Sequence, residues 1–206
     1  AGKPEVLVSK IPTIAIVSTG DELVDVGKPI GDAQIRSSND RAMEASLNQA
    51  GYKHTVRKSF PDDLNVLRTG IAELLSQNDI LVLSGGVSMG KYDYMPQVLE
   101  ELGIRMIFHK ITQRPGLPMW FGVSADEKPI FALPGNPVSS LVCLARYVLP
   151  AIRQSQQQTP QQTEEKVVLA EPLHFDADMS WFVPVTLQYK ESGITEAIPK
   201  LPNTSG

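Results

Sequence analysis

Apolar residues follow two alternating patterns along the first three quarters of the chain. Continuous β-branched and apolar runs at residues 14–17, 80–83 and 130–133 are typical of strands that are buried on both faces. Between these runs the apolar positions recur at helical spacing. The clearest helical stripe comprises Leu64, Leu67, Ile71, Leu74 and Leu75. The alternation predicts an α/β fold, a three-layer sandwich around a mostly parallel sheet.

Capping residues predict where the helices begin. Asn39 is expected to be the N-cap of the first helix, and one Asp within residues 61–63 is expected to cap the second. A third helix is expected from about Asp93. Asn136 as N-cap and Pro137 at the first helical position predict a long helix that ends near residue 152. Its expected buried face comprises Val138, Leu141, Val142, Ala145, Val148, Leu149 and Ile152.

The periodicity breaks at a glutamine-rich segment, residues 154–165, which predicts a domain boundary. Residues 1–153 would form the ligand-binding α/β domain. Residues 166–206 are interpreted as a partial β domain with strands near 166–169 and 181–189. So few strands do not close a sheet comfortably. We therefore expect an excised part of a longer protein, which folds and binds ligand weakly but does not complete a reaction.

Composition limits the kinds of partner. The 206 residues carry 19 basic and 23 acidic side chains, a net charge of -4 that gives no general attraction to nucleic acid or to an anionic membrane. No apolar run is long enough to span a bilayer. The single cysteine, Cys143, lies in an apolar helical run and is expected to be a buried core thiol in a reducing, cytoplasmic compartment. Backbone amides or a few placed cations must then hold any anionic ligand.

Three glycine-containing segments each follow a buried strand, at residues 19–22, 85–90 and 134–137. In a parallel sheet they emerge at one carboxyl edge, where open α/β sheets bind ligands. Glycine allows close backbone approach to a phosphate, and exposed amides and helix N-termini hold anions. Taken singly, a tight turn explains the Gly-Gly pair and helix capping explains Asn136 and Pro137. The three together, in order, favour a binding site.

Four motifs follow one another along the chain. They are residues 18–23 (Ser-Thr-Gly-Asp-Glu-Leu), 84–90 (Ser-Gly-Gly-Val-Ser-Met-Gly) followed by Asp93-Tyr94, 114–118 (Arg-Pro-Gly-Leu-Pro) and 133–139 (Leu-Pro-Gly-Asn-Pro-Val-Ser). In order, spacing and identity this series resembles the signature motifs of the molybdopterin molybdenumtransferase family. The resemblance is dense over residues 6–152 and looser from 166 onward. The molybdopterin adenylyltransferases, which have a similar fold, carry a Thr-Gly-Gly-Thr-Gly type of loop instead, so the motif points to the metal-inserting step.

The resemblance implies a reaction that inserts molybdenum from molybdate into adenylylated molybdopterin, with Mg²⁺ assisting the release of AMP. It also implies a homodimer in the longer protein and contact with the molybdopterin adenylyltransferase. Such chemistry needs donors for two phosphates, a carboxylate for a divalent cation, and cations or hydroxyls for an oxyanion.

The family pattern assigns roles to particular residues. The implied catalytic residues are Glu22, Asp93 and Arg114, and the implied metal ligands are Asp21, Glu22 and Asp93. The implied substrate-binding residues are Thr19, Gly20, Asp21, Asn39, Asp62, Gly85, Gly86, Ser88, Gly90, Lys110, Pro115, Gly116, Pro134, Gly135, Asn136 and Ser139. Simpler alternatives remain open for some: a solvated turn for Asp21 and Glu22, an N-cap for Asp93, and a snorkelling strand-end side chain for Lys110.

One position departs from the family pattern. Ser37 stands where the family usually has Asp, so a ligand- or metal-binding carboxylate is missing. Either Asp21, Glu22 or Asp40 compensates, or the chain is a pterin- or nucleotide-binding scaffold without catalysis. The sequence also suggests a probe of the site: Gly86→Val is expected to block ligand approach and leave the fold largely intact.

Overall fold

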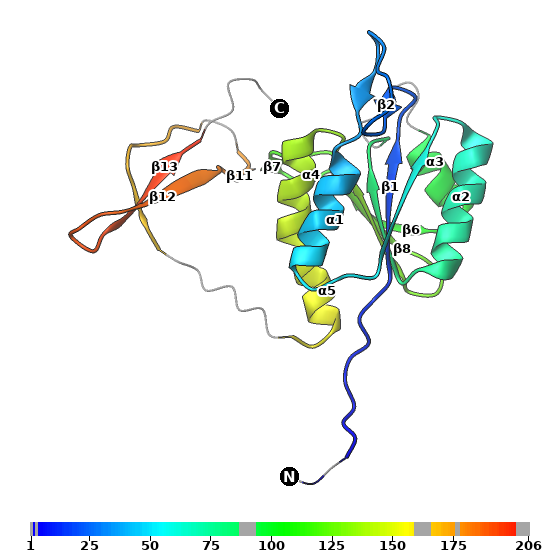
Figure 1. Ribbon diagram of the computed structural model, residues 1–206, viewed down its shortest axis with the longest axis horizontal. Helices are drawn as coiled ribbons and strands as arrows, with labels where there is room; N and C mark the ends of the chain where they lie inside the picture. The colour runs from blue at the N-terminus through cyan, green and yellow to red at the C-terminus, as the bar shows by residue number, and fades with distance from the viewer. Residues whose placement is uncertain (1, 3, 87–93, 159–165, 176–177, 201–206) are drawn as a thin grey trace.

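The computed structural model describes residues 2, 4–86, 94–158, 166–175 and 178–200. Its centre is a six-stranded sheet in the order β4-β1-β5-β9-β8-β6 (Figure 1). The strands are β1 (Ile14–Thr19), β4 (Thr55–Phe60), β5 (Ile80–Ser84), β6 (Arg105–His109), β8 (Trp120–Val123) and β9 (Pro129–Leu133). Within this sheet β8 runs in the opposite direction to the other five strands, so its pairings with β6 and β9 are antiparallel and the remaining pairings are parallel. The prediction of a mostly parallel sheet is confirmed.

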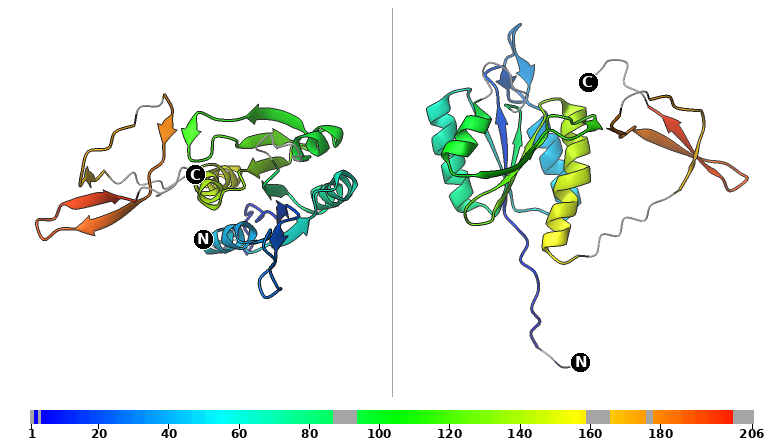
Figure 2. Two further views of the ribbon diagram at one scale, coloured as in Figure 1. Left: turned by 90° about the horizontal axis from the view of Figure 1, so that it is seen from above. Right: turned by 180° about the vertical axis from the view of Figure 1, so that it is seen from behind.

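Helices cover both faces of this sheet (Figure 2). One face packs against α1 (Asn39–Gln49) and a long helix made of α4 (Pro137–Cys143), the π-helical η1 (Leu144–Val148) and α5 (Leu149–Ser155). The other face packs against α2 (Leu64–Gln77) and α3 (Met95–Glu101). Strand alternation divides β1 between these layers: Ile14 and Ile16 face α1, whereas Ala15 and Val17 face α2. The predicted three-layer sandwich is confirmed.

The observed helix starts confirm two of the expected caps and correct one. Asp63 caps α2, accepting from the backbone N–H groups of Asn65 and Val66 at 2.9 Å each. Asn136 caps α4, accepting from Ser139 N at 3.1 Å. Asn39, however, is not the N-cap of α1, which begins with Asn39 itself after Ser38. Asp93 lies outside the described residues.

The expected buried face of the long helix is wrong in its first half. Val138 and Leu141 are 47% and 37% exposed, and the buried residues are Ser139, Ser140, Cys143, Leu144, Val148 and Ile152. Two features explain the difference. The Ser140 hydroxyl lies 2.9 Å from Pro134 O, so a polar contact draws the first turn inward. The π-helical η1 then places about one more residue in its turn, and this shifts the buried face around the helix axis. A prediction that assumes 3.6 residues per turn throughout misses the shift.

Cys143 lies in this helix as a fully buried free thiol, as expected. Burial raises its pKa to about 12, although the Gln113 amide opposes that shift. The thiol is therefore protonated and unreactive at neutral pH.

Smaller pairings surround the main sheet. β10 (Val168–Leu169), β13 (Thr195–Pro199) and β12 (Val185–Tyr189) form a three-stranded sheet in that order. β11 (Ser180–Trp181) pairs with β7 (Gln113–Arg114), and β2 (Leu23–Val24) pairs with β3 (Ile35–Arg36). The guanidinium of Arg146 lies 4.9 Å from the centre of the Phe182 ring. The division at residues 154–165 remains a prediction, because residues 159–165 lie outside the described part of the chain.

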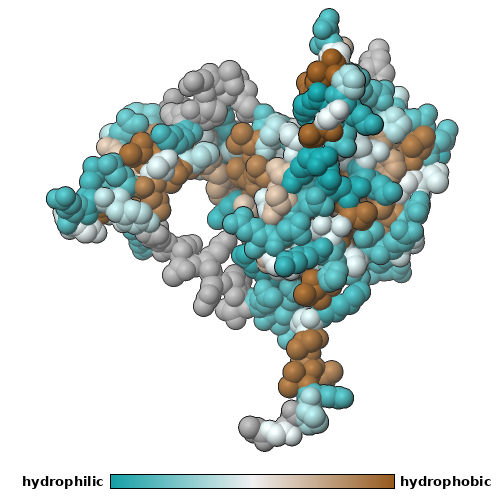
Figure 3. All heavy atoms as spheres, in the orientation of Figure 1, coloured by the Kyte–Doolittle hydropathy of each residue, from teal (hydrophilic) through white to brown (hydrophobic). Residues whose placement is uncertain are grey.

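The surface carries a conspicuous apolar segment before β1. Val6, Leu7 and Val8 are all exposed, and part of the extended segment toward the N-terminus shows as brown spheres at the bottom of the view in Figure 3. Among the described residues, no helix has both the length and the apolar composition to cross a membrane.

Asp79, which directly precedes β5, is hydrogen-bonded to Thr13, which directly precedes β1. Its Oδ2 accepts from the Thr13 backbone N–H at 2.8 Å and from the Thr13 hydroxyl at 2.9 Å, and Lys10 Nζ lies 3.2 Å away. The hydrogen bond from the Thr13 backbone lowers the pKa of Asp79 below its ordinary value of 3.8. A carboxyl whose pKa is lowered on folding stabilises the folded protein above its unfolded-state pKa, and this stabilisation is lost as the pH falls through the folded-state pKa.

We therefore predict that Asp79→Asn lowers the free energy of unfolding at pH 7 by about 1 kcal/mol or less, because the side chain is partly exposed. The difference from the wild type should shrink as the pH falls below 4. Urea unfolding at pH 7 and pH 3 measures both values. Asp126→Asn, in the exposed turn between β8 and β9, is the control. A difference that persists unchanged at pH 3 would contradict the prediction.

Candidate functional site

A cavity lies where β1, β5 and β9 end, and we call it the strand-end cavity. These strands are neighbours in the sheet, and the chain leaves β1 toward α1 on one face and β5 toward α3 on the other. Such a switch point is where open α/β sheets bind ligands. The cavity has a volume of about 120 Å³ and is lined by Ser18, Thr19, Glu22, Leu23, Ile35, Arg36, Ser37, Ser38, Asn39, Ser84, Gly85, Gly135 and Pro137. The three post-strand loops thus meet, while their part in binding stays a prediction.

Asn39 links two of these loops. Its side-chain nitrogen donates to Ser84 Oγ at 2.9 Å and to Gly135 O at 2.8 Å. A carboxamide nitrogen carries two hydrogens, so each can serve one acceptor. The first residue of α1 therefore links the end of β5 to the loop after β9, and Asn39, Ser84 and Gly135 all line the strand-end cavity.

The glycines of the loops differ in what they tolerate. Gly86 has φ +68°, and a Cβ there would lie 3.1 Å from Thr19 Oγ1 and 3.3 Å from Met95 Cβ. Gly86→Val would therefore strain the backbone as well as block the site, and the expectation that it leaves the fold intact is wrong. Gly135 has no positive φ, and among the described residues a Cβ there would meet Gly85 Cα alone, at an ordinary 3.7 Å. Gly135→Ala is the better probe.

The acidic residues predicted at the site separate in space. Glu22 lines the strand-end cavity. Asp21 instead accepts from the backbone N–H of Asp62 at 3.1 Å, so its carboxylate holds the loop before α2. Within the described part of the chain, no three His, Cys, Asp or Glu side chains converge as a metal site. With the described residues alone, Glu22 would hold Mg²⁺ jointly with ligand oxygens, which is the usual mode of Mg²⁺ binding beside phosphates.

Three predicted site residues, Ser88, Gly90 and Asp93, lie outside the described residues.

A second cavity, the Arg114 cavity, adjoins the first. Its volume is about 450 Å³, and it is lined by Gln113, Arg114, Pro115, Gly116, Leu117, Pro118, Pro134, Gly135, Asn136, Ser139 and Met179. Gly135 borders both cavities. The predicted residues Arg114 and Ser139 are thus brought together, whereas Lys110 lines neither cavity. Lys110 follows β6 with φ +71°, and its N–H donates to Met119 O at 2.8 Å.

Sequence reasoning missed Gln113, which supports the Arg114 cavity from behind. Gln113 is buried, and its side-chain nitrogen donates to Pro115 O at 2.8 Å and lies 3.6 Å from Cys143 Sγ. Its side-chain oxygen accepts from the Tyr147 hydroxyl. A lone Gln beside a proline-rich turn gives no sequence signal for this role, because two of its partners, Cys143 and Tyr147, lie 30 and 34 residues away in the long helix. The strand-end serines Ser18 and Ser84 were also missed as lining residues, although strand alternation could have placed them.

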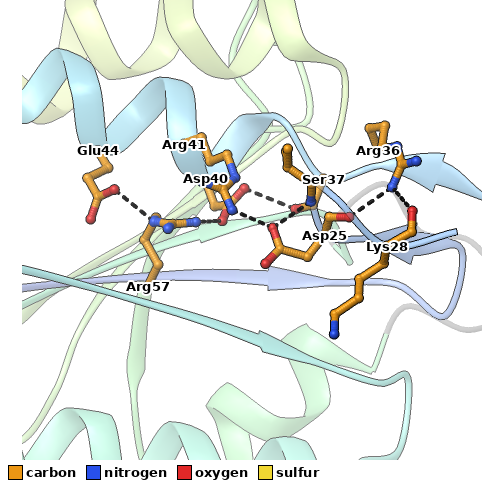
Figure 4. A network of polar contacts seen from close by, with 9 residues as sticks. Asp25, Lys28, Arg36, Ser37, Asp40, Arg41, Glu44 and Arg57 are labelled. Carbon is orange, nitrogen blue, oxygen red and sulfur yellow. Dashed lines mark hydrogen bonds and ion pairs between the residues drawn. The ribbon is translucent and has the colours of Figure 1, made fainter.

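Ser37, the position that departs from the family pattern, is buried within a polar network (Figure 4). Its hydroxyl donates to Asp40 Oδ1 at 3.0 Å, and Asp40 Oδ2 pairs with Arg57 Nη1 at 2.6 Å. Arg57 also pairs with Glu44 at 2.8 Å, and the hydrogen bond to Asp40 raises the pKa of Arg57.

Both oxygens of the Asp40 carboxylate have partners within this network, Ser37 and Arg57. Asp40 lines a third cavity, the Arg57 cavity, together with Leu23, Asp25, Ser37, Arg57, Lys58 and Ser59. Asp40 is paired with Arg57 and does not line the strand-end cavity, so compensation by Asp40 for the carboxylate missing at position 37 stays a prediction. Glu22 remains the acidic residue lining the strand-end cavity among those described.

The fold is a doubly wound α/β domain with two adjoining cavities at the carboxyl edge of its sheet. Residues 15–154 match the family described as "Probable molybdopterin binding domain". The chain is 36% identical, over all 206 residues, to the molybdopterin molybdenumtransferase of Synechocystis, and 38% identical over 152 residues to that of Nostoc. The chain therefore belongs to this family of probable molybdopterin-binding domains.

The matches extend over only part of the relatives. The chain spans 50% of the Synechocystis protein, and its match to the Nostoc protein takes in 73% of the chain and 35% of that protein. A molybdopterin biosynthesis MoeA protein from Pyrococcus horikosii superposes with a TM-score of 0.73 at 29% identity, covering 93% of this chain and 45% of that one. The crystal structure of a molybdenum cofactor biosynthesis protein B, at 14% identity and a TM-score of 0.50, shares the fold alone.

We predict that Asn39→Ala destabilises the protein by about 1–2 kcal/mol, because it leaves Ser84 Oγ and Gly135 O without their donor. Amide hydrogen exchange at Gly85 and in the loop after β9 should accelerate. Ser38→Ala is the matched control, since the Ser38 side chain makes no capping hydrogen bond to α1. Equal stability and equal exchange rates in the two variants would refute the link between the loops.

Proposed function

We propose that this chain forms the substrate site of a molybdopterin molybdenumtransferase. The reaction transfers molybdenum from molybdate to adenylylated molybdopterin and releases AMP. One observation carries the proposal: in a member of this family, the loops after β1, β5 and β9 converge on the strand-end cavity, and the Arg114 cavity adjoins it. The test is to supply adenylylated molybdopterin, molybdate and Mg²⁺ and to follow AMP release and cofactor formation.

In this proposal the two cavities bind different parts of the substrate set. The strand-end cavity, lined by loop backbone and hydroxyls, suits the phosphates of the adenylylated pterin. The Arg114 cavity suits molybdate, a dianion, because a guanidinium offers several donors in a fixed plane and Ser139 lies beside it. Since Gly135 borders both, the metal and the pterin would be held on opposite sides of a single residue.

In this proposal Mg²⁺ is held by Glu22 together with substrate phosphate oxygens. When bound, the ion would neutralise charge on the departing AMP phosphate. Asp21 supports the metal only indirectly, through its hydrogen bond to the loop before α2. We further propose a homodimer, contact with the molybdopterin adenylyltransferase, and a cytoplasmic location, with no nucleic-acid or membrane partner.

A second candidate function is a binding scaffold that holds the pterin or nucleotide without turnover. The arrangement of Ser37 favours it, because the nearby Asp40 carboxylate is committed to Arg57. Tight AMP binding without AMP release would support the scaffold and count against the transferase.

We predict that Gly135→Ala weakens AMP binding about tenfold and leaves the Tm within a few degrees of the wild type. The added methyl group narrows the space between the loops after β5 and β9 at an ordinary contact distance. Isothermal titration calorimetry with AMP measures the effect. Gly31→Ala, in the loop between β2 and β3, adds the same group away from the cavity and should bind AMP normally. Unchanged affinity in a folded Gly135→Ala protein would place the nucleotide elsewhere.

We predict that Glu22→Gln abolishes the Mg²⁺ dependence of AMP binding and of AMP release, because the amide keeps the shape but removes the anionic oxygen that Mg²⁺ prefers. Titrating Mg²⁺ at fixed AMP measures the dependence in binding, and the release assay measures it in turnover. Asp21→Asn is the matched control and should keep the dependence. If Glu22→Gln behaves like the wild type at saturating Mg²⁺, another carboxylate such as Asp93 holds the metal.

A further inference from the structure

The hydroxyl of Ser18 is fully buried, yet it makes no hydrogen bond within the described protein. Ser18 is 2% exposed and lines the strand-end cavity. A buried polar group that lacks a partner costs folding free energy, so native proteins rarely keep one without a reason. An absent ligand is one such reason, and the direction of the hydroxyl identifies where the ligand would lie.

Strand register sets that direction. Ser18 on β1 is level with Ser84 on β5 and with Ser59 on β4. Level residues of parallel neighbours project to the same face, and so do residues two apart on one strand. Ile16 and Val82, two residues earlier, pack against α1. Ser18 and Ser84 therefore project to the α1 face, at the level where the apolar rows end and the strand-end cavity begins.

The N-terminus of α1 lines the same cavity through Ser38 and Asn39. Ser38, the N-cap residue, has helical angles, φ −119° and ψ −30°, and its side chain makes no capping hydrogen bond. Among the described residues, no side chain accepts from the backbone N–H groups of residues 39–41. The first turn of this eleven-residue helix thus presents uncapped amides, with the partial positive charge that favours anions.

We propose that Ser18 and the first turn of α1 together bind one phosphate group of the ligand, with the Ser84 hydroxyl as a further donor. Ser84 Oγ already accepts from Asn39, which leaves its own hydrogen free to donate to the phosphate. The cavity is small beside the roughly 300–1,000 Å³ that whole drug-sized ligands occupy, so it takes one group of the ligand. The inference rests on the proposed function for the identity of the phosphate donor, adenylylated molybdopterin.

The charges around the cavity are consistent with an anion whose binding depends on a cation. Glu22 brings a negative charge to the lining. Arg36 also lines the cavity, and its guanidinium is held by the backbone carbonyls of Asp25 and Lys28, to which it donates. The formal charges of Glu22 and Arg36 balance. Asp40, in the first turn of α1, is paired with Arg57, so the amides of this turn still favour an anion. A divalent cation between Glu22 and the phosphate would strengthen the binding further.

The test compares binding with stability in the 206-residue chain. Inorganic phosphate, AMP and adenosine are titrated by calorimetry with and without Mg²⁺. Ser18→Ala should weaken phosphate and AMP binding about tenfold, the expected value of a hydrogen bond to a charged group, and leave adenosine binding unchanged. Its Tm should stay equal or rise, because the variant removes a buried hydroxyl that has no internal partner.

Two further variants separate ligand binding from structure. Ser59→Ala removes a hydroxyl at the same level on the adjacent strand, but Ser59 lines the Arg57 cavity and phosphate binding should not change. Ser38→Asp places a carboxylate beside the first turn of α1, where it should repel phosphate without lowering the Tm.

The inference is overturned if Ser18→Ala binds phosphate as the wild type does, if it lowers the Tm, or if the wild type binds neither phosphate nor AMP. Its failure is distinguishable from failure of the proposed function. If Ser18→Ala loses phosphate binding but the wild type transfers no molybdenum, the phosphate site is supported and the transferase function is rejected. If the wild type transfers molybdenum but Ser18→Ala binds phosphate normally, the transferase function is supported and the phosphate site at Ser18 is rejected.

Discussion

Parallel pairing of β1, β5 and β9 in one register is the constraint on which the rest of the structure depends. It levels Ser18 with Ser84, and Ser84 with Leu133, so the three following loops start from one edge. Both faces of these strands are buried under helices, and a slip of one residue would exchange the two apolar faces. The free energy that such a slip would cost fixes the strand register, and the register fixes where the three loops begin. The geometry of the cavity therefore depends on the packing of the core.

Neutral carboxamides hold the loops at the cavity edges. Asn39 ties the end of β5 to the loop after β9, and Gln113 ties the turn at Pro115 to the long helix. A buried amide satisfies several backbone and hydroxyl groups without the desolvation cost of a charge. The charged residues Glu22 and Arg114 each line a cavity, and in the described part of the chain these carboxamides, not the two charged side chains, make the hydrogen bonds that link the loops. By contrast, Asp40 and Arg57 neutralise each other and serve the fold.

Local patterns predicted the elements that depend on near neighbours in the sequence. The buried strands, the apolar stripe of α2 and the caps Asp63 and Asn136 each follow from residues within a few positions of one another. The long helix departs from this rule, because η1 changes the helical period and Ser140 turns inward to meet Pro134 O. Asn39 is a second exception. Its side chain does not cap α1 but donates to Ser84 Oγ and Gly135 O, which lie 45 and 96 residues away in the sequence.

The sequence by itself determined the α/β class, the order of strands and helices, and the meeting of three post-strand loops, because hydrophobic period and parallel pairing are local or topological properties. Only the tertiary structure decided which polar side chains face the cavities. It placed the Asp21 carboxylate against the backbone N–H of Asp62 and paired Asp40 with Arg57. It also kept Lys110 out of both cavities and left the Ser18 hydroxyl without a partner in the part of the chain that the structure describes. Such outcomes depend on which donors and acceptors are brought within about 3 Å by packing of distant segments, and spacing along the chain does not encode those distances.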